Sequence, residues 1–227
     1  EDCCEALGSK WDNINVGNFG IASSFSFFFS HHMTTMEGGL IACSRLDIAE
    51  QMKILRSHGW LRNVDHIGYN LVGSDLDPRY TFSNWGFNLR PTEIQASFGL
   101  HQLKKLNDFN TKRNKLAAMF FNYIDEQECL NRPIVDEKAI PSWFSLPLMV
   151  EQESAFTRKD LVEHLEKNGV ETRPILAGNL AKHPVAEYFP EFKEYVFTGA
   201  DLIHSQGIYI GLSPFTEEYE IDKLINI

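Results

Sequence analysis

The chain has 227 residues, of which 43% are hydrophobic and 23% charged, and its formal net charge is -10. This composition is typical of a folded globular protein and excludes a disordered one. The negative charge, with no local run of Lys and Arg to offset it, argues against binding to nucleic acid or to anionic membrane surfaces.

Two stretches bear on where the protein works. The most apolar run, Phe25 to Phe29, is far too short to cross a bilayer. The opening Glu-Asp-Cys-Cys-Glu lacks the basic start of a signal peptide. We therefore expect a cytoplasmic protein, and the abrupt start predicts that further residues precede this chain in the whole protein.

The first half of the chain alternates strand-like and helix-like segments. Residues 16–29 are dense in Phe, Ile and Val after a glycine turn, which predicts a buried strand, and residues 40–43 predict a second one. Residues 47–57 have apolar side chains at helical spacing and stop just before Gly59, a position favoured for a left-handed helix cap. Strand, turn, strand and helix are the order of an α/β domain.

Three further features follow in the chain. Residues 63–82 have no clean period, which predicts a long functional loop. Pro91 predicts the first turn of a helix. A longer amphipathic helix is indicated by apolar residues that repeat at helical spacing, namely Leu116, Met119, Phe120 and Tyr123.

The remainder of the chain has the pattern of a separate small domain. Residues 142–150 are extended, and Thr157 with Asp160 forms a capping-box pattern that predicts a helix start. That helix is expected to stop at Asn168-Gly169, and residues 170–175 predict another strand. We predict two domains, residues 1–125 and 126–227, the second of them a small α+β domain.

The cysteines indicate neither disulfides nor a metal. Cys3, Cys4, Cys43 and Cys129 contain no C-x-x-C pair and are too sparse for a secreted disulfide scaffold. Reduced thiols are the expected state. A zinc site on the adjacent Cys3 and Cys4 is disfavoured, because neighbouring residues rarely point into one tetrahedral site.

Three motifs stand out, and each taken alone has an ordinary explanation. They are Glu1-Asp2, the Ser26 to Gly39 segment, and the Trp85 to Gln95 segment. Asp2 alone reads as a solvated acid. His31 and His32 read as loop histidines or half of a metal site, and Asn88 and Arg90 as residues ahead of a helix.

In this order and spacing, the three motifs resemble the DegT/DnrJ/EryC1/StrS family of fold-type I pyridoxal-phosphate enzymes. The resemblance covers essentially the whole chain and implies an incomplete three-layer α/β/α large domain followed by the small domain. The usual family pattern is Ser-Phe-x-x-x-Lys-Asn-hydrophobic-Thr-x-x-Glu-Gly-Gly, in which the lysine holds the cofactor covalently. Counting back from Glu37-Gly38-Gly39, His31 stands at the lysine position.

This exchange determines the expected function. A neutral imidazole cannot hold the cofactor aldehyde as the lysine does, but it can move protons near neutral pH. The exchange is similar to that in the C-3 dehydratase branch. It implies dehydration of a nucleotide-linked 4-keto-6-deoxy sugar to a 4-keto-3,6-dideoxy sugar, with pyridoxal or pyridoxamine phosphate as cofactor and glutamate as amino donor.

The resemblance also implies a role for each site residue. His31 is expected to be the acid/base. Asp2 would pair with the pyridine nitrogen, Ser26 would bind the cofactor phosphate, and Asn88 would reach the phosphate of a neighbouring subunit in a homodimer. His58 is expected near the leaving hydroxyl and Arg90 near the glutamate carboxylate. For both residues, a purely structural role is weighted equally.

Two alternative functions stay open. One is a non-catalytic relative that binds the cofactor or a nucleotide sugar. The other is an iron-sulfur dehydrase, disfavoured because residues 59–128 contain no cysteine and a cluster needs about four thiolates. The sequence does not identify the nucleotide or the hexose, and residues 63–79 are the expected local contributor to that recognition.

Overall fold

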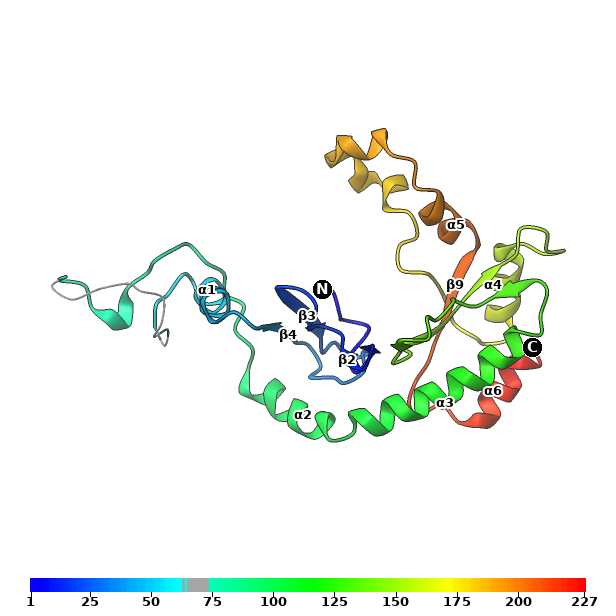
Figure 1. Cartoon of the computed structure of the whole chain (residues 1–227), viewed down its shortest axis with the longest axis horizontal. Helices are drawn as coiled ribbons and strands as arrows, with labels where there is room; N and C mark the ends of the chain where they lie inside the picture. Colours follow the sequence, from blue (N-terminus) through cyan, green and yellow to red (C-terminus); the bar gives the residue numbers. More distant parts are fainter. Residues whose placement is uncertain (63, 65–73) are drawn as a thin grey trace. The chain divides into compact units, whose positions relative to one another are not determined.

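The computed structural model describes residues 1–62, 64 and 74–227, and divides into unit 1, Glu1–Asn107, and unit 2, Asp108–Ile227. Unit 1 contains the first elements of the chain (Figure 1). They are β1 (Lys10–Trp11), β2 (Ile14–Asn15), β3 (Ala22–Ser26), β4 (Gly39–Cys43), α1 (Leu46–Arg56), the short 3-10 helix η1 (Pro78–Tyr80), α2 (Glu93–Leu103) and the start of α3 (Leu106–Ile124).

A small sheet lies at the start of unit 1. Strands β3 and β4 pair antiparallel, from Ala22 opposite Cys43 to Ser26 opposite Gly39. On the other edge of β3 the first residues run parallel to it, because Cys3 N–H donates to the Ser24 carbonyl at 2.9 Å and Ser24 N–H donates to the Glu1 carbonyl at 2.9 Å. The N-terminal residues therefore belong to the same hydrogen-bonded layer as β3.

The end of α1 is tied to a distant segment by backbone hydrogen bonds. Phe87 N–H donates to the Leu55 carbonyl at 2.6 Å, and His58 N–H donates to the Phe87 carbonyl at 2.7 Å. Gly59 has a φ of +81°, and a Cβ there would lie 1.6 Å from the Asn84 carbonyl oxygen. Only glycine fits this crossing, which confirms the predicted left-handed turn after the helix.

The start of α2 corrects one expectation. Thr92 is the N-cap, and its hydroxyl and the Gln95 side chain form a reciprocal capping box. Pro91 therefore lies before the cap and not in the first turn. The Gln95 side chain also donates to the Glu37 carbonyl at 2.9 Å, so this helix start is anchored to the loop between β3 and β4.

Unit 2 is built on a four-stranded antiparallel sheet in the order β5-β7-β9-β8. The strands of unit 2 are β5 (Leu130–Asn131), β6 (Ala139–Ile140), β7 (Ser145–Val150), β8 (Thr172–Pro174) and β9 (Gly207–Gly211). The helices after α3 are α4 (Arg158–Lys167), η2 (Leu180–Lys182), η3 (Pro184–Tyr188), η4 (Pro190–Glu194), α5 (Thr198–Gln206) and α6 (Glu218–Ile225).

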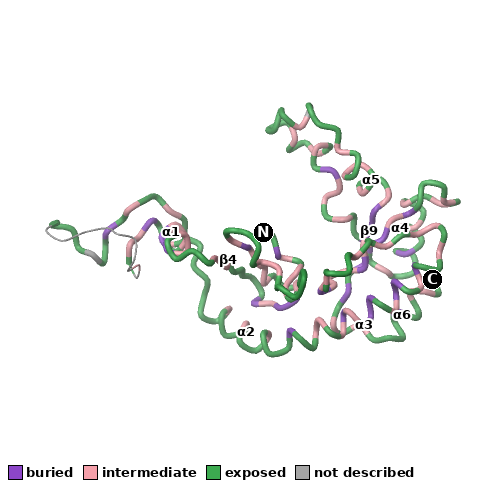
Figure 2. Tube along the Cα trace, in the orientation of Figure 1, coloured by how far each residue is buried: buried purple, intermediate pink, exposed green. Residues whose placement is uncertain are grey.

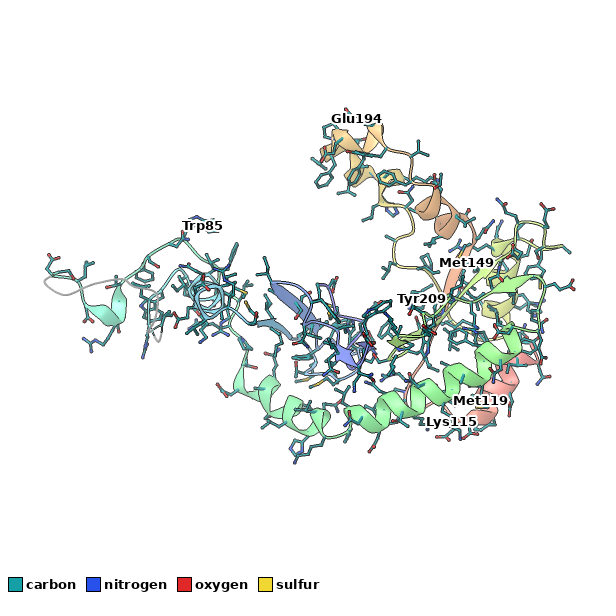
Figure 3. The ribbon with its side chains drawn as sticks, in the orientation of Figure 1. Trp85, Lys115, Met119, Met149, Glu194 and Tyr209 are labelled. Carbon is teal, nitrogen blue, oxygen red and sulfur yellow. The ribbon has the colours of Figure 1, made fainter. Side chains whose placement is uncertain are left out.

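The apolar core of unit 2 is continuous. Figure 2 shows buried positions along α3 and β9, where Leu116 and Ile208 are fully buried. Along β7 every second residue is buried, as expected for a strand with one face on a core. Lys115 and Met119 lie one turn apart on α3 (Figure 3), and the Lys115 ammonium forms an ion pair with Glu218 of α6.

Most sequence-predicted elements are confirmed. The helix at residues 47–57 is α1, the strand at 40–43 is β4, and the capping box at Thr157 opens α4. The predicted strand over 16–29 shortens to β3. Half of the predicted loop at 63–82 lies outside the described residues. No helix among the described residues is long and apolar enough to span a membrane.

Candidate active site

The first candidate site residue, Asp2, is held beside β3. It bridges to Ser24 in parallel register, and its Oδ1 accepts the Cys4 N–H at 3.1 Å and the Ser24 hydroxyl at 3.4 Å. Hydrogen bonds from the Cys4 thiol and amide hold the pKa of this exposed carboxyl below its ordinary value. Asp2 is therefore a carboxylate at neutral pH, presented at the surface of unit 1.

Glu1 is an anchor for this strand that the sequence reasoning missed. Its carboxylate accepts backbone N–H groups from Gly17 at 2.8 Å, Phe19 at 2.7 Å and Gly20 at 2.6 Å. The hydrogen bond from Gly17 is the largest cause of a lowered pKa for this group. A glutamate followed by a Gly-rich turn does not by itself predict such a nest, since the three amides converge only in the folded chain.

His31 lies in the loop after β3, and its ring orientation is set by Cys4. The Nδ1 atom is 2.8 Å from the Cys4 carbonyl oxygen. A carbonyl can only accept, so Nδ1 carries the hydrogen and the neutral ring has its basic lone pair on Nε2. The side chain is half-buried, with the Phe28 ring edge-on at 6.1 Å.

Cys4 thus joins two of the predicted functional residues. Its amide donates to Asp2 and its carbonyl accepts from His31, so one residue contacts both a carboxylate and an oriented imidazole. Sequence reasoning treated Cys4 only as a thiol. The sequence has no signal for these two hydrogen bonds, because main-chain contacts do not depend on side-chain identity.

Ser26 ends β3 and opens the loop that contains His31. Its Oγ accepts the Phe28 N–H at 3.2 Å, which leaves the hydroxyl hydrogen to donate to another group. The loop closes on itself through Phe27, whose N–H donates to the Gly38 carbonyl at 2.9 Å and whose carbonyl accepts the Thr35 N–H at 2.9 Å. These bonds fix Ser26 and His31 on one short, ordered turn.

His58, Asn88 and Arg90 form a second set at the end of α1. Ser57 and Asn88 make an antiparallel bridge, and Arg90 Nε donates to Asn88 Oδ1 at 3.3 Å. His58 is exposed and has a left-handed backbone, with φ +62°. The structure therefore brings the six predicted residues together as two sets, one around β3 and one around the end of α1.

Comparisons with known proteins identify the class of this chain. The solved Escherichia coli GDP-4-keto-6-deoxy-D-mannose-3-dehydratase with bound hydrated PLP matches with a TM-score of 0.89 at 31% identity, over 100% of this chain and 59% of that chain. The Helicobacter pylori aminotransferase PseC matches with a TM-score of 0.84 at 25% identity, over 99% of this chain and 57% of that one. The fold is that of the pyridoxal-phosphate aminotransferases, represented in part.

The family follows from the sequence match. The chain belongs to the DegT/DnrJ/EryC1/StrS aminotransferase family, whose model matches residues 1–227. It is 32% identical to the GDP-4-keto-6-deoxy-D-mannose 3-dehydratase of Yersinia pseudotuberculosis, over 100% of this chain and 58% of the relative. It is 30% identical to the dTDP-4-dehydro-2,6-dideoxy-D-glucose 3-dehydratase of Saccharopolyspora spinosa, over 99% of this chain and 51% of that relative. The chain thus spans between one half and three fifths of these relatives.

Proposed function

We propose that the whole protein is a pyridoxal-phosphate- and glutamate-dependent dehydratase. It removes the C-3 hydroxyl of a nucleotide-linked 4-keto-6-deoxyhexose to give the 4-keto-3,6-dideoxy sugar. The observation that carries the proposal is His31, at the family's lysine position and held through Nδ1 by the Cys4 carbonyl. Two similar relatives bear the name 3-dehydratase, one acting on a GDP sugar and one on a dTDP sugar.

The residues around β3 fit the cofactor. Asp2 is an ionised carboxylate at the surface, suited to a protonated pyridine nitrogen, and Ser26 has a hydroxyl hydrogen suited to a phosphate oxygen. When bound, the cofactor supplies an electron sink and carries the amino group taken from glutamate. A related solved enzyme is described with a trapped PLP-glutamate geminal diamine, which supports glutamate as the donor.

The work of the chain in the reaction is proton transfer and positioning. With Nδ1 bound to Cys4, the Nε2 atom of His31 is the nitrogen that takes a proton and returns it. His58 would donate toward the leaving hydroxyl and Arg90 would bind the glutamate carboxylate. Asn88 would serve the cofactor of a second copy, so we propose a homodimer that works in the cytoplasm.

A spectroscopic experiment tests the proposed function. The complete protein with pyridoxal phosphate should lose its aldehyde absorbance on addition of glutamate, and should then release ammonia and a 3-deoxy product from a 4-keto nucleotide sugar. Absence of a glutamate-dependent change would favour a binding protein without catalysis. Stoichiometric iron in the purified protein would favour the iron-sulfur dehydrase instead.

A further inference from the structure

A surface cavity of about 240 Å³ in unit 1 gathers positive charge from three parts of the sequence. It lies against the C-terminal half of α1, the segment that follows this helix, and the segment before α2. We call it the cationic cavity, and its lining consists of Lys53, Arg56, Ser57, Trp60, Arg62 and Arg90. Four of these six side chains are cations, in a chain whose net charge is -10.

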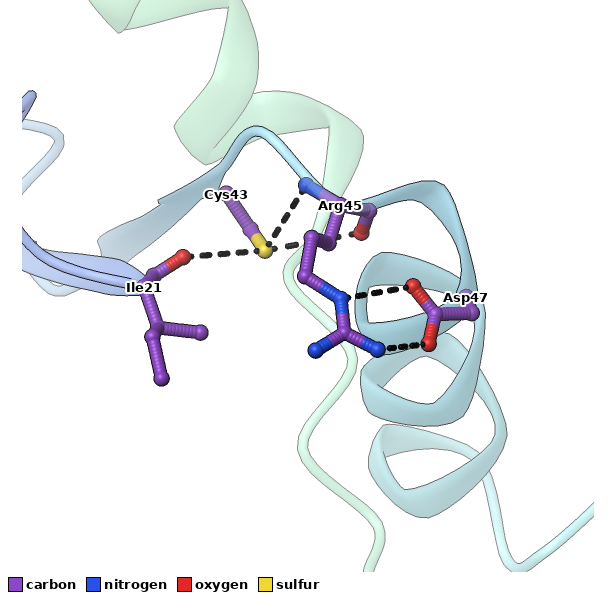
Figure 4. A network of polar contacts seen from close by, with 4 residues as sticks. All are labelled: Ile21, Cys43, Arg45 and Asp47. Atoms are coloured by element: carbon purple, nitrogen blue, oxygen red, sulfur yellow. Dashed lines mark hydrogen bonds and ion pairs between the residues drawn. The ribbon is translucent and has the colours of Figure 1, made fainter.

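The four cations differ from other described cations in their ion pairing. Within the described part of the chain, none of the four takes part in an ion pair, whereas other cations in both units do. Arg45 shows the contrast in the same unit, since its guanidinium engages both carboxylate oxygens of Asp47 (Figure 4). The nearby acid on α1, Glu50, is buried and does not line the cavity.

Neighbouring groups position two of the cations. The Arg62 guanidinium lies over the Trp60 ring at 5.3 Å, and that ring stacks on Phe82 at 6.0 Å with an interplanar angle of 11°. Arg90 Nε is oriented by Asn88 Oδ1 at 3.3 Å. Such contacts reduce the side-chain freedom that a ligand would otherwise have to remove on binding.

The remaining polar groups of the lining are also able to donate. Ser57 has a hydroxyl, and the indole N–H of Trp60 is buried with no acceptor among the described residues. Among the described residues, no Asp, Glu, Asn or Gln side chain lines the cavity. A cavity with converging donors and unneutralised positive charge selects a ligand that has several acceptor oxygens and more than one negative charge.

We propose that the cationic cavity binds the diphosphate of the nucleotide-linked sugar. The proposal rests on the proposed function for its substrate class. It places the diphosphate on Lys53, Arg56 and Arg62, with Arg90 at the boundary toward the reacting sugar. A diphosphate offers multiple charges and oxygens to these donors, and its recognition is independent of the nucleobase, which differs between the GDP and dTDP relatives.

The two other anions of the proposed reaction match this cavity less well. Glutamate carries an ammonium group that four cations would repel, and each of its carboxylates has one charge. The cofactor phosphate is assigned to Ser26, which does not line the cavity. Arg90 alone keeps a role in binding the amino donor.

Direct binding measurements on the complete protein test the proposal without turnover. Calorimetry would compare GDP, inorganic pyrophosphate, guanosine and glutamate for the unaltered protein and for Lys53→Gln and Arg62→Gln. Each substitution removes a charge-assisted hydrogen bond, so we expect GDP and pyrophosphate affinity to fall about tenfold to a hundredfold. Guanosine and glutamate affinity should stay unchanged. Arg62→Lys should retain most of the GDP affinity, because the charge remains.

Arg45→Gln is the matched control, because Arg45 is an exposed cation of the same unit already paired with Asp47. It should bind GDP as the unaltered protein does. Affinity for GDP within twofold of the original in both cavity variants, or an equal loss for guanosine, would overturn the inference. A selective loss for glutamate would do the same. If GDP binding weakens as expected but no nucleotide sugar is dehydrated, the diphosphate site stands and the proposed function fails.

Discussion

Cys4 makes the contacts on which the proposed chemistry depends, and it makes two of them with its backbone. Its amide donates to Asp2 and its carbonyl accepts from His31. The thiol donates to the Ser24 hydroxyl at 3.8 Å and lowers the pKa of Asp2, while burial raises the pKa of the thiol itself. The thiol is thus a neutral donor at physiological pH and stabilises the ionised form of its neighbour.

His31 can be tested by a substitution that preserves its hydrogen bond. Asparagine at this position can still donate an amide hydrogen to the Cys4 carbonyl but has no titratable nitrogen, so His31→Asn should lower kcat about a hundredfold to ten-thousandfold. Cofactor binding should remain, as read from the visible spectrum. His101→Asn, an exposed histidine on α2, is the control with unchanged kcat. Retention of more than a tenth of the activity in His31→Asn would contradict the acid/base role.

The pKa of Asp2 gives a pH prediction of defined sign. Because hydrogen bonds from Cys4 lower this pKa below the ordinary 3.8, the carboxylate and its contacts persist above that value and are lost only as pH falls through the lower folded value. Cys4→Ala removes the thiol donor but keeps the amide and carbonyl. Carboxyl carbon NMR should show the Asp2 midpoint rising toward 3.8 in this variant. An unchanged midpoint would mean that the thiol does not stabilise the carboxylate.

At the scale of elements, the turn after α1 is the critical junction of unit 1. Gly59 allows the chain to cross the segment near Asn84, and the strand-like contacts of Ser57 with Asn88 follow from that crossing. This single turn places His58, Asn88 and Arg90 near one another. It also brings Arg62 back toward α1 to complete the cationic cavity.

Gly59 and Gly169 have the same φ but different surroundings. Substituting each one therefore separates the cost of backbone strain from the cost of a steric clash. Gly59 and Gly169 both have a φ of +81°, but a Cβ at Gly169 meets nothing within 4 Å. Gly169→Ala should therefore cost about 1–2 kcal/mol, from the left-handed conformation alone. Gly59→Ala should cost about 3 kcal/mol or more, because the backbone near Asn84 must move. Urea unfolding of the two variants measures the difference, and equal losses would show that the crossing tolerates a side chain.

At the scale of the whole molecule, the two units differ in how their apolar side chains are buried. Among the described residues, the buried apolar side chains of unit 1 are Cys3, Met33, Ile54 and Leu106, while all the other buried apolar side chains lie in unit 2. Large apolar side chains are exposed in both units, for example Leu100 at 69% in unit 1 and Val196 at 85% in unit 2. Unit 2 has the larger core of its own, so its stability depends less on other parts of the protein.

Limited proteolysis of the chain 1–227 tests this asymmetry. Cleavage should begin in unit 1 and leave a resistant fragment close to residues 108–227. Leu116→Ala removes a fully buried side chain of unit 2 and should lower its unfolding free energy by about 2–5 kcal/mol, so that the fragment becomes sensitive. Val196→Ala, at an 85% exposed position, should change nothing. Early cleavage within 108–227 of the unaltered chain would contradict the prediction.

Sequence prediction succeeded where the interactions join residues that are close together along the chain. The capping box of Thr157 and Asp160 and the apolar spacing on α3 act within a few residues, and both were predicted correctly. Pro91 was predicted in the first turn of its helix but precedes the N-cap, because Thr92 and Gln95 form a stronger start signal. The domain boundary at 125 and the six site residues stay predictions, and recognition by residues 63–79 lies mostly outside the described structure.

The sequence by itself determined the family, the local elements and the presence of His31 where a lysine usually stands, since these are matters of residue type and near spacing. Only the tertiary structure decided that the Cys4 carbonyl orients His31 and that Lys53, Arg56, Arg62 and Arg90 line one cavity. The physical reason is that such convergence depends on the path of the backbone between distant residues. That path is set by many weak contacts acting together, such as the crossing at Gly59, and no short pattern encodes it.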